Sequence, residues 1–299
     1  MFSDIRAAVV GSINMDLILN MEKVPDVGEN VLGTSYGNAS GGKGANQAIG
    51  LARLGAKVKM IGKVGNDANG KKLLANLKQN NVDVSSVAVN GSQTGLAAIL
   101  IDGDGKNRIV VYEGANAEIN AEEAKSNLND IDLLLLQFET NEEVVIECVN
   151  KAVSSGITTV IDCGPAKNLC LEKMQGADII SPNESETFAL TGVLPEDDEK
   201  ALVASKILMD RSKAKFVVLK LGARGCSVYD GETFRVIPSY PSVVVDTTAA
   251  GDCFTAAMAL EYKRSGDIYA ACDSGNKAGS YAVSKMGAQD SMPTLKDLL

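Results

Sequence analysis

Residues 246–254, DTTAAGDCF, place two aspartates six positions apart around small residues and one glycine. A β-branched run precedes them and an Ala/Met/Leu-rich stretch follows, which predicts a strand, a tight turn and a helix. The first N–H groups of a helix lack intrahelical partners and carry the positive end of its dipole, so they can bind a phosphate. Ala249, Ala250 and Gly251 would leave these groups accessible. Asp252 could then take a proton from an attacking hydroxyl, which is the chemistry of phosphoryl transfer.

A helix N-cap is the other interpretation of Asp252, because Asp commonly caps helices and then has no chemical role. A cap needs neither the preceding Ala-Ala-Gly nor the second acid at Asp246. We therefore favour an anion cradle with a catalytic carboxylate beside it.

Residues 37–44, GNASGGKG, nearly match a phosphate-binding P-loop. Gly44 stands where that motif needs Ser or Thr to hold magnesium, and no long apolar strand precedes it. We interpret the segment as a glycine-rich entry to a helix, with Lys43 and Asn46 directed at a small hydroxylated ligand. A flexible turn before a helix remains open as an alternative.

Residues 11–16, GSINMD, directly follow the first predicted strand. Ligands of open α/β sheets bind at the carboxyl ends of the strands. In extended chain Asn14 and Asp16 point to the same side, and both can hydrogen-bond sugar hydroxyls. A local turn stabilised by Asn and Asp is equally compatible with this stretch.

Composition narrows the classes of function. The chain has 299 residues and a net charge of −9, which argues against nucleic acid or an anionic membrane as partner. It has no histidine, which excludes Ser-His-Asp and Cys-His nucleophiles and histidine-bound zinc. Its six cysteines include no C-x-x-C pair, and no signal peptide or membrane-spanning stretch is evident. We therefore expect a cytoplasmic protein with reduced thiols.

Strands and helices are predicted to alternate along most of the chain. The predicted strands are 7–10, 57–61, 132–136, 158–161, 178–180 and 216–219, and the predicted helices include 45–54, 141–154, 184–190 and 197–210. This order predicts a three-layer α/β/α fold with a mainly parallel central sheet, formed by a single domain over residues 1–299. Two β-rich insertions, about 13–40 and 94–112, predict a small β-sheet lid, the second being a hairpin that turns at 102–107.

Several motifs together resemble those of a known family. DTTAAGD resembles the C-terminal signature of the ribokinase-like (pfkB) carbohydrate kinases, and SGGKGANQA (40–48) resembles their N-terminal signature. GSINMD, SPNESE (181–186), LGARG (221–225) and GAQDSMP (287–293) follow in the family's order and spacing. The resemblance covers essentially the whole chain and implies an ATP-dependent sugar kinase with a ribokinase-like fold.

The resemblance also implies a role for individual residues. Asp252 would be the base, and the backbone of Ala249, Ala250, Gly251 and Asp252 the anion hole. The implied sugar contacts are Asn14, Asp16, Gly42, Lys43, Asn46 and Glu139. The implied nucleotide site comprises Asn183 and Glu186 near the phosphates and magnesium, a cradle of Lys220, Leu221, Gly222, Ala223, Arg224 and Gly225, and Asn276 beside the adenine. The implied monovalent-cation site, usually for potassium, comprises Asp246, Thr248, Ala282, Lys285, Gly287 and Ser291.

Some positions depart from the family's pattern. Lys220 stands where threonine is often found, Asn276 where histidine is often found, and Tyr281 and Met286 lie among the cation-site residues. None of these changes removes a chemically essential group.

Substrate choice rests on the residues expected around the sugar. Lys43 is the only basic residue in 11–16 and 40–48, which argues against a phosphosugar, and aromatic residues are too few to favour stacking of a nucleoside base. We expect ribose, phosphorylated at its 5-hydroxyl by ATP, with deoxyribose or fructose as alternatives. A catalytically silent sugar- or nucleotide-binding regulator also stays open, whereas a dehydrogenase lacks its G-x-G-x-x-G motif. The exposed edge of the lid sheet, together with the resemblance, predicts a homodimer through the lid.

Overall fold

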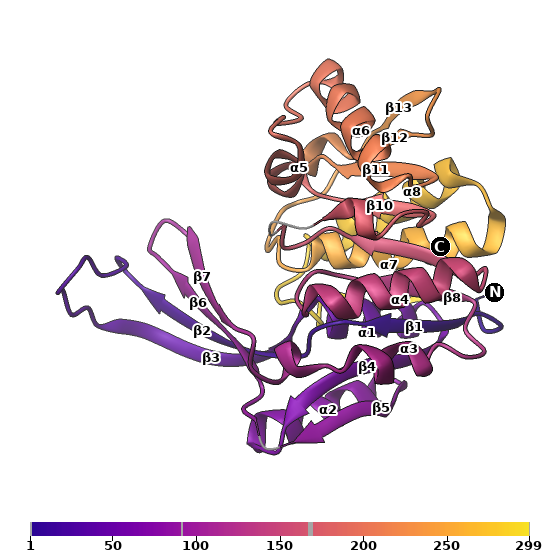
Figure 1. Ribbon diagram of the computed structural model, residues 1–299. Coiled ribbons are helices and arrows are strands. Elements are labelled where there is room, and N and C mark those ends of the chain that lie inside the picture. Colours follow the sequence, from indigo (N-terminus) through magenta and orange to yellow (C-terminus); the bar gives the residue numbers. More distant parts are fainter. Residues whose placement is uncertain (1, 91, 167–169, 299) are drawn as a thin grey trace.

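The computed structural model describes residues 2–90, 92–166 and 170–298. In this part of the chain, helices cover both faces of a nine-stranded sheet, and a separate four-stranded sheet projects away from it (Figure 1). The strands of the large sheet are β1 (Arg6–Val10), β4 (Lys57–Gly65), β5 (Val82–Asn90), β8 (Leu133–Leu136), β9 (Thr158–Asp162), β10 (Ile179–Ser181), β11 (Phe216–Lys220), β12 (Cys226–Tyr229) and β13 (Phe234–Ile237). Their order is β13-β12-β11-β10-β9-β8-β1-β4-β5, and all neighbours pair in parallel except β11 with β12 and β12 with β13.

The helices and the small sheet complete the fold. The α-helices are α1 (Lys43–Arg53), α2 (Ala68–Gln79), α3 (Ala121–Ser126), α4 (Glu142–Ser154), α5 (Glu184–Thr191), α6 (Asp198–Ser212), α7 (Ala250–Ser265) and α8 (Ile268–Ala282). The short 3-10 helices are η1 (Gly114–Glu118), η2 (Leu171–Lys173), η3 (Gly222–Arg224) and η4 (Leu295–Leu298). The small sheet, called the lid below, has the order β3 (Gly33–Gly41), β2 (Asn14–Met21), β6 (Gly95–Ile101) and β7 (Asn107–Tyr112).

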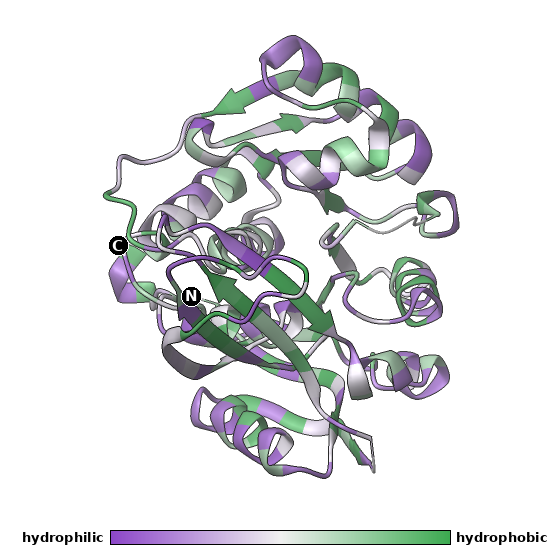
Figure 2. Ribbon diagram, turned by 90° about the vertical axis from the view of Figure 1, so that its left-hand side faces the viewer, coloured by the Kyte–Doolittle hydropathy of each residue, from purple (hydrophilic) through white to green (hydrophobic). Residues whose placement is uncertain are grey.

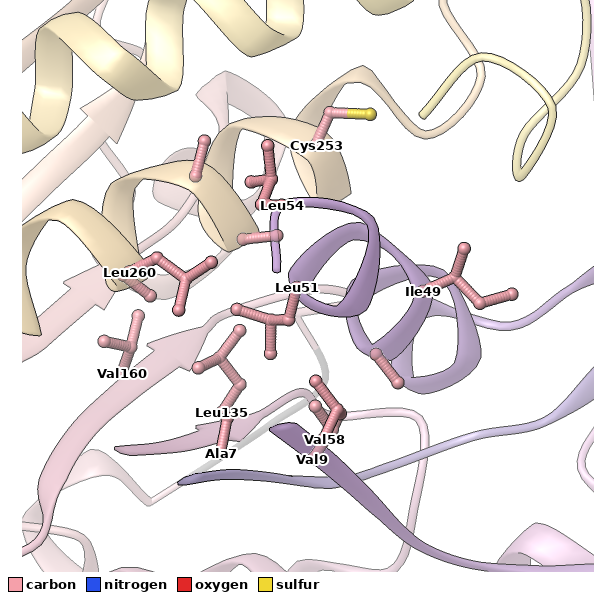
Figure 3. Packing of buried hydrophobic residues seen from close by; sticks show 14 of the residues in the cluster. Ala7, Val9, Ile49, Leu51, Leu54, Val58, Leu135, Val160, Cys253 and Leu260 are labelled. Atoms are coloured by element: carbon pink, nitrogen blue, oxygen red, sulfur yellow. The ribbon is translucent and has the colours of Figure 1, made fainter. Parts of the chain in front are cut away.

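Two hydrophobic clusters lie on the two faces of the large sheet. Because side chains alternate along a strand, Ala7 and Val9 of β1 pack in the cluster that includes α1, α2, α7 and α8, whereas Ala8 and Val10 pack with α3 to α6. Figure 3 shows the first cluster, where side chains from α1 and α7, among them Leu51 and Leu260, point toward those of the strands. In Figure 2 the central strands are mostly hydrophobic, and the helices around them carry hydrophilic stretches. The sheet is therefore buried on both faces.

The predicted fold class, a three-layer α/β/α protein with a small additional sheet, is confirmed. The predicted strand 7–10 is observed as β1 (Arg6–Val10), and the predicted hairpin is formed by β6 and β7. The edge strand β5 was not predicted, because its buried and exposed residues do not form a continuous apolar run. The antiparallel strands β12 and β13 were also missed. In the described residues, no helix has the length and apolar character needed to cross a membrane.

Strand β1 leads directly into the lid. After β1, the chain needs only three residues before β2 begins at Asn14, and it returns along β3 to Gly41, one residue before Gly42. Gly42 has φ +91°, and a Cβ atom there would lie 2.8 Å from the backbone of both Ser12 and Asn14. Only glycine allows this approach without strain, so Gly42 brings the start of α1 against the end of β1.

Candidate active site

Asp252 is the third residue of α7, and its side chain lies inside the protein with 4% of its surface exposed. The N-cap is Ala249, which adopts a left-handed conformation with φ 59°, and no side chain caps this helix. The alternative interpretation of Asp252 as an N-cap is therefore wrong. The carboxylate accepts hydrogen bonds from Asn46 at 2.9 Å and Gln47 at 3.1 Å, both on α1.

A cleft of about 790 Å³ opens in front of the N-terminus of α7. It brings the predicted base together with backbone of the predicted anion hole and with two lysines from elsewhere in the chain. Its lining residues are Lys43, Asn183, Glu184, Ser185, Leu194, Glu196, Lys220, Gly222, Thr247, Ala249, Gly251 and Asp252. Two lysines and the partly exposed N-terminus of α7 can face a polyphosphate, whereas Glu184, Glu196 and Asp252 add negative charge to the lining. Glu184, Leu194 and Glu196 were not predicted.

A buried ion pair joins Lys220 to Asp162, which sequence analysis missed. The Lys220 ammonium lies 2.9 Å from the carboxylate of Asp162, the last residue of β9, which is fully buried. Burial opposes the charge of Asp162, but Lys220 and Lys43 outweigh it and lower the pKa of that carboxyl. A Cβ atom on Gly251 would lie 3.7 Å from Lys220 Nζ. The ammonium therefore sits beside the N-terminus of α7.

One signal could have found Asp162. Asp162 directly follows the predicted apolar strand 158–161, just as Ser12 and Asn14 follow the predicted strand 7–10. Polar residues at the carboxyl ends of parallel strands meet at one edge of the sheet.

The predicted sugar residues gather where β1, the lid and α1 meet. Asn14 is 3% exposed and accepts a hydrogen bond from Asn116 at 2.7 Å. Glu139 accepts hydrogen bonds from the Ser12 hydroxyl and, at 3.1 Å, from the backbone N–H of Lys43. These residues come from four separate segments, and Asn116 and Ser12 were not predicted.

Two charged groups in this region have shifted pKa values. Burial, with contributions from Glu139 and Asp252, raises the pKa of Asp16 to about 7. Burial opposes the charge of Lys43, but surrounding carboxylates, foremost Asp162 and Asp252, raise its pKa. Lys43 Nζ lies 4.0 Å from an oxygen of Asp252. Lys43 is therefore protonated and positively charged next to the candidate base.

The predicted nucleotide residues separate into two groups. Asn183, Lys220 and Gly222 line the cleft, whereas Glu186, Leu221, Ala223, Arg224, Gly225 and Asn276 are outside its lining.

Hydrogen bonds and an ion pair hold several of these residues in place. Asn183 and Glu186 form a capping box at the start of α5. Arg224 hydrogen-bonds the carbonyl of Pro195 and lies 3.6 Å from Asp198. Asn276 donates hydrogen bonds to the carbonyls of Ile237 and Pro238 at 3.0 and 3.1 Å.

The predicted cation-site residues lie in the segment before α7 and in the end of α8 and the loop after it. The carboxylate of Asp246 accepts hydrogen bonds from Thr248, through both its N–H and its hydroxyl, and from the N–H of Gly287 at 2.8 Å. Ser291 donates its hydroxyl to Ala288, and the carbonyl of Ala282 accepts the N–H of Lys285. Asp246 thus ties the two segments together. Among the residues described, no group of three or more His, Cys, Asp and Glu side chains could hold a metal ion.

Comparison with known proteins places this geometry in a family. A model of the pfkB family carbohydrate kinases matches residues 4–295. The chain is similar to the ribokinase of Bacillus subtilis (strain 168), with 38% identity over 294 residues and 97% of each chain covered. It is also similar to a deoxyribokinase of Salmonella typhi, with 30% identity over 97% of this chain and 96% of that one.

A solved structure extends the similarity to the fold. The structure of Arabidopsis thaliana ribokinase complexed with ribose and ATP superimposes with a TM-score of 0.87 at 31% identity, covering 98% of this chain and 96% of that one. The family membership predicted from the motifs is thereby confirmed: the chain belongs to the pfkB family of carbohydrate kinases.

Proposed function

We propose that this protein phosphorylates D-ribose at its 5-hydroxyl with ATP, giving ribose 5-phosphate and ADP. The observation that carries the proposal is the buried Asp252 carboxylate at the start of α7, in one cleft with Lys43 and Lys220. The similarity to ribokinases, one of them solved with ribose and ATP, supports ribose and ATP as the substrates.

In the proposed reaction, Asp252 accepts the proton of the ribose 5-hydroxyl as that oxygen bonds to the γ-phosphorus. The bond from the γ-phosphorus to the β,γ-bridging oxygen breaks, and ADP leaves with the electron pair. The N–H groups of Gly251 and Asp252 would face the phosphoryl oxygens in the anion hole formed by the backbone of residues 249–252, while that of Ala250 donates to the carbonyl of Thr247 at 3.3 Å.

Two lysines supply positive charge on either side of this path. Lys43 lies 4.0 Å from Asp252, and Lys220 flanks Gly251. Because Lys220 is buried and the side chain of Lys43 is only 24% exposed, these charges act at lower dielectric than in solution and would stabilise the transferring phosphoryl group more strongly.

The remaining sugar and nucleotide contacts are assigned by position. We propose that Asn14, Asp16, Gly42, Lys43, Asn46 and Glu139 hold the ribose. The loop of Leu221, Gly222, Ala223, Arg224 and Gly225 and the side chain of Asn276 would surround the nucleoside part of ATP.

Magnesium and potassium fit the donor atoms that are present. Magnesium in such sites is held by one or two carboxylates together with substrate phosphates, and Glu186 with Asn183 at the start of α5 offers this donor set. When bound, it would neutralise charge on the phosphates. Potassium would be held by the oxygens of Asp246, Thr248, Ala282, Lys285, Gly287 and Ser291. These residues come from two segments, which the hydrogen bond between Gly287 and Asp246 already joins.

Assembly and location are part of the proposal. The apolar strand β7 of the lid is exposed along its length, which supports a homodimer formed through the lid. All six cysteines are unpaired, which supports the cytoplasm as the location, and the net charge of −9 argues against a nucleic-acid partner.

The substrate is tested by measuring ADP formation with ribose, deoxyribose, fructose, fructose 6-phosphate and adenosine, each in potassium and in sodium buffer. We expect ribose to give the highest kcat/KM, potassium to activate, and ³¹P NMR to show a phosphate on C5. A higher kcat/KM with deoxyribose would move the assignment to the deoxyribokinase branch. No turnover with any sugar would favour the silent regulator.

The role of Asp252 is tested by Asp252→Asn. We expect kcat to fall by about 10²- to 10⁴-fold, the contribution of a general base, while calorimetry shows that ADP still binds. Loss of ADP binding and of thermal stability in equal measure would show that the carboxylate acts only structurally.

A further inference from the structure

Two amide side chains contact the carboxylate of Asp252, and two more contact those amides, an arrangement that the role of Asp252 as a base alone does not require. Asn46 donates to one carboxylate oxygen and Gln47 to the other, at 2.9 and 3.1 Å. The two donors are neighbours on α1, and both are buried. Each oxygen of the candidate base is thus held by its own N–H donor.

Two further glutamines donate hydrogen bonds to the carbonyl oxygens of these amides. The Gln47 carbonyl oxygen accepts a hydrogen bond from Gln137 at 2.6 Å, and the Asn46 carbonyl oxygen accepts one from Gln289 at 3.1 Å. If the amide of Gln47 turned over, two NH₂ groups would face each other and Asp252 would face a carbonyl oxygen. Gln289 is held in turn by Asn76, which donates to its carbonyl oxygen, so Gln289 directs the N–H group of Asn46 toward the carboxylate. The carbonyl oxygen of Gln137 is buried without a hydrogen-bond partner among the described residues, so Gln137 follows the orientation that Asp252 and Asp162 impose on Gln47.

Gln47 also links Asp252 to the ion pair of Asp162 and Lys220. Its NH₂ group donates one hydrogen to Asp252 and the other to Asp162, at 3.1 and 2.9 Å. The two carboxylates would repel each other without an intervening donor. One neutral amide therefore holds two buried anions, one beside Lys43 and the other beside Lys220.

We propose that Asn46, anchored by Gln289, and Gln47, hydrogen-bonded by Gln137, form an amide clamp that fixes both oxygens of Asp252, and that Gln47 and Gln289 are positioning residues for proton transfer. The proposal rests on the proposed role of Asp252 as the base.

The clamp affects charge as well as position. Burial, the largest influence, raises the pKa of Asp252, and Lys43 and the donors Asn46 and Gln47 oppose this shift. The charged groups that face the carboxylate are Lys43 from α1, Asp162 from β9 with its partner Lys220 from β11, and Asp16 from the lid strand β2. Removing an N–H donor while these charges stay in place destabilises the anion, so the base is protonated up to a higher pH.

The test compares Gln47→Met with Thr255→Val, using the sugar that the wild-type protein phosphorylates best. Met has nearly the shape of Gln but cannot donate to either carboxylate. Thr255 lies one turn beyond Asp252 on α7 and donates to Asp162 at 3.2 Å, so Thr255→Val disturbs Asp162 and leaves the contacts of Asp252 in place. For Gln47→Met we expect kcat to fall about 10- to 100-fold, with KM for ATP and for sugar within about threefold. We expect the acid limb of its kcat–pH profile to move to higher pH and Thr255→Val to keep kcat within about threefold of wild type.

Gln289→Met tests the hydrogen bond from Gln289 to Asn46, and it is the second test of the clamp if Gln47→Met does not fold. It frees the amide of Asn46, a proposed sugar contact, so we expect a lower kcat and also a higher KM for the sugar. An unchanged kcat in a folded Gln47→Met or Gln289→Met protein would overturn the clamp, as would equal losses in Gln47→Met and Thr255→Val. A wild-type protein that phosphorylates no sugar would instead count against the proposed function.

Discussion

Asp16 is the residue whose charge state changes in the physiological range. Burial in the sugar region, with Glu139 and Asp252 nearby, raises the pKa of this carboxyl to about 7. A carboxylate can accept hydrogen bonds from two sugar hydroxyls, and protonation replaces part of that capacity by a donor. Sugar affinity should therefore depend on pH near neutrality.

We predict that KM for ribose rises about tenfold as the pH falls from 8 to 6, because the ionised fraction of a group with a pKa near 7 falls by about that factor. The sign follows from the raised pKa: the binding form is the anion, and it is lost on acidification. Initial rates against ribose concentration at saturating ATP measure this. Asp16→Asn, which does not titrate, should give a weaker but pH-independent KM. A pH-independent KM in the wild-type protein would contradict the assignment.

How much of the site the sequence predicts depends on how far apart the contacting residues are in the chain. Asp252 could be predicted because its turn and helix lie in one short segment. The clamp could not, since the contact of Asn46 with Asp252 spans 206 residues and that of Gln289 with Asn46 spans 243. A buried amide on a helix gives no local pattern that distinguishes a positioning role from ordinary core polarity.

At the scale of elements, the ion pair of Asp162 and Lys220 joins the ends of β9 and β11 across the short strand β10. Both side chains are buried, so the loss of Lys220 leaves the Asp162 carboxylate in the interior without its ion-pair partner, with Lys43 as the other nearby cation. The contact therefore helps to hold the carboxyl ends of these strands, beside which the cleft is built.

We predict that Lys220→Met lowers the free energy of unfolding by about 3–5 kcal/mol, the usual cost of stranding a buried charge. Asp162→Asn in the same chain should recover part of this loss, because it removes the unpaired carboxylate. Urea unfolding of the two single variants and the double variant gives the coupling energy. Additive losses would show that the two groups do not interact in solution.

The elements themselves were predictable where the local pattern was strong. The buried parallel strands were found because their apolar runs are continuous. The strand β5 was missed because it lies at the sheet edge with alternating exposure, and α2 because only three of its residues, Gly70, Leu73 and Leu77, are buried. Edge elements bury too little surface to leave a clear periodicity.

The lid carries an exposed apolar surface at its edge. Ile109, Val110, Val111 and Tyr112 of β7 are between 48% and 66% exposed. A long apolar strand at a sheet edge pairs readily with another strand, which fits the proposed dimer.

We predict that light scattering after gel filtration gives twice the mass of one chain for the wild-type protein and the mass of one chain for Val110→Lys. A lysine at this exposed position should leave the fold intact and place two like charges at the interface. Val203→Lys is the matched control, because Val203 is 45% exposed on α6 and should not change the mass. A wild-type monomer at micromolar concentration would rule out the dimer.

The packing of α1 against α7 has a consequence for how the protein is made. The ribosome delivers Asn46, a proposed sugar contact, 206 residues before Asp252, the proposed base. A nascent chain that has not yet completed α7 lacks both the base and the anion cradle. We therefore expect catalysis to begin only after synthesis is nearly finished, so that unfinished chains cannot consume ATP.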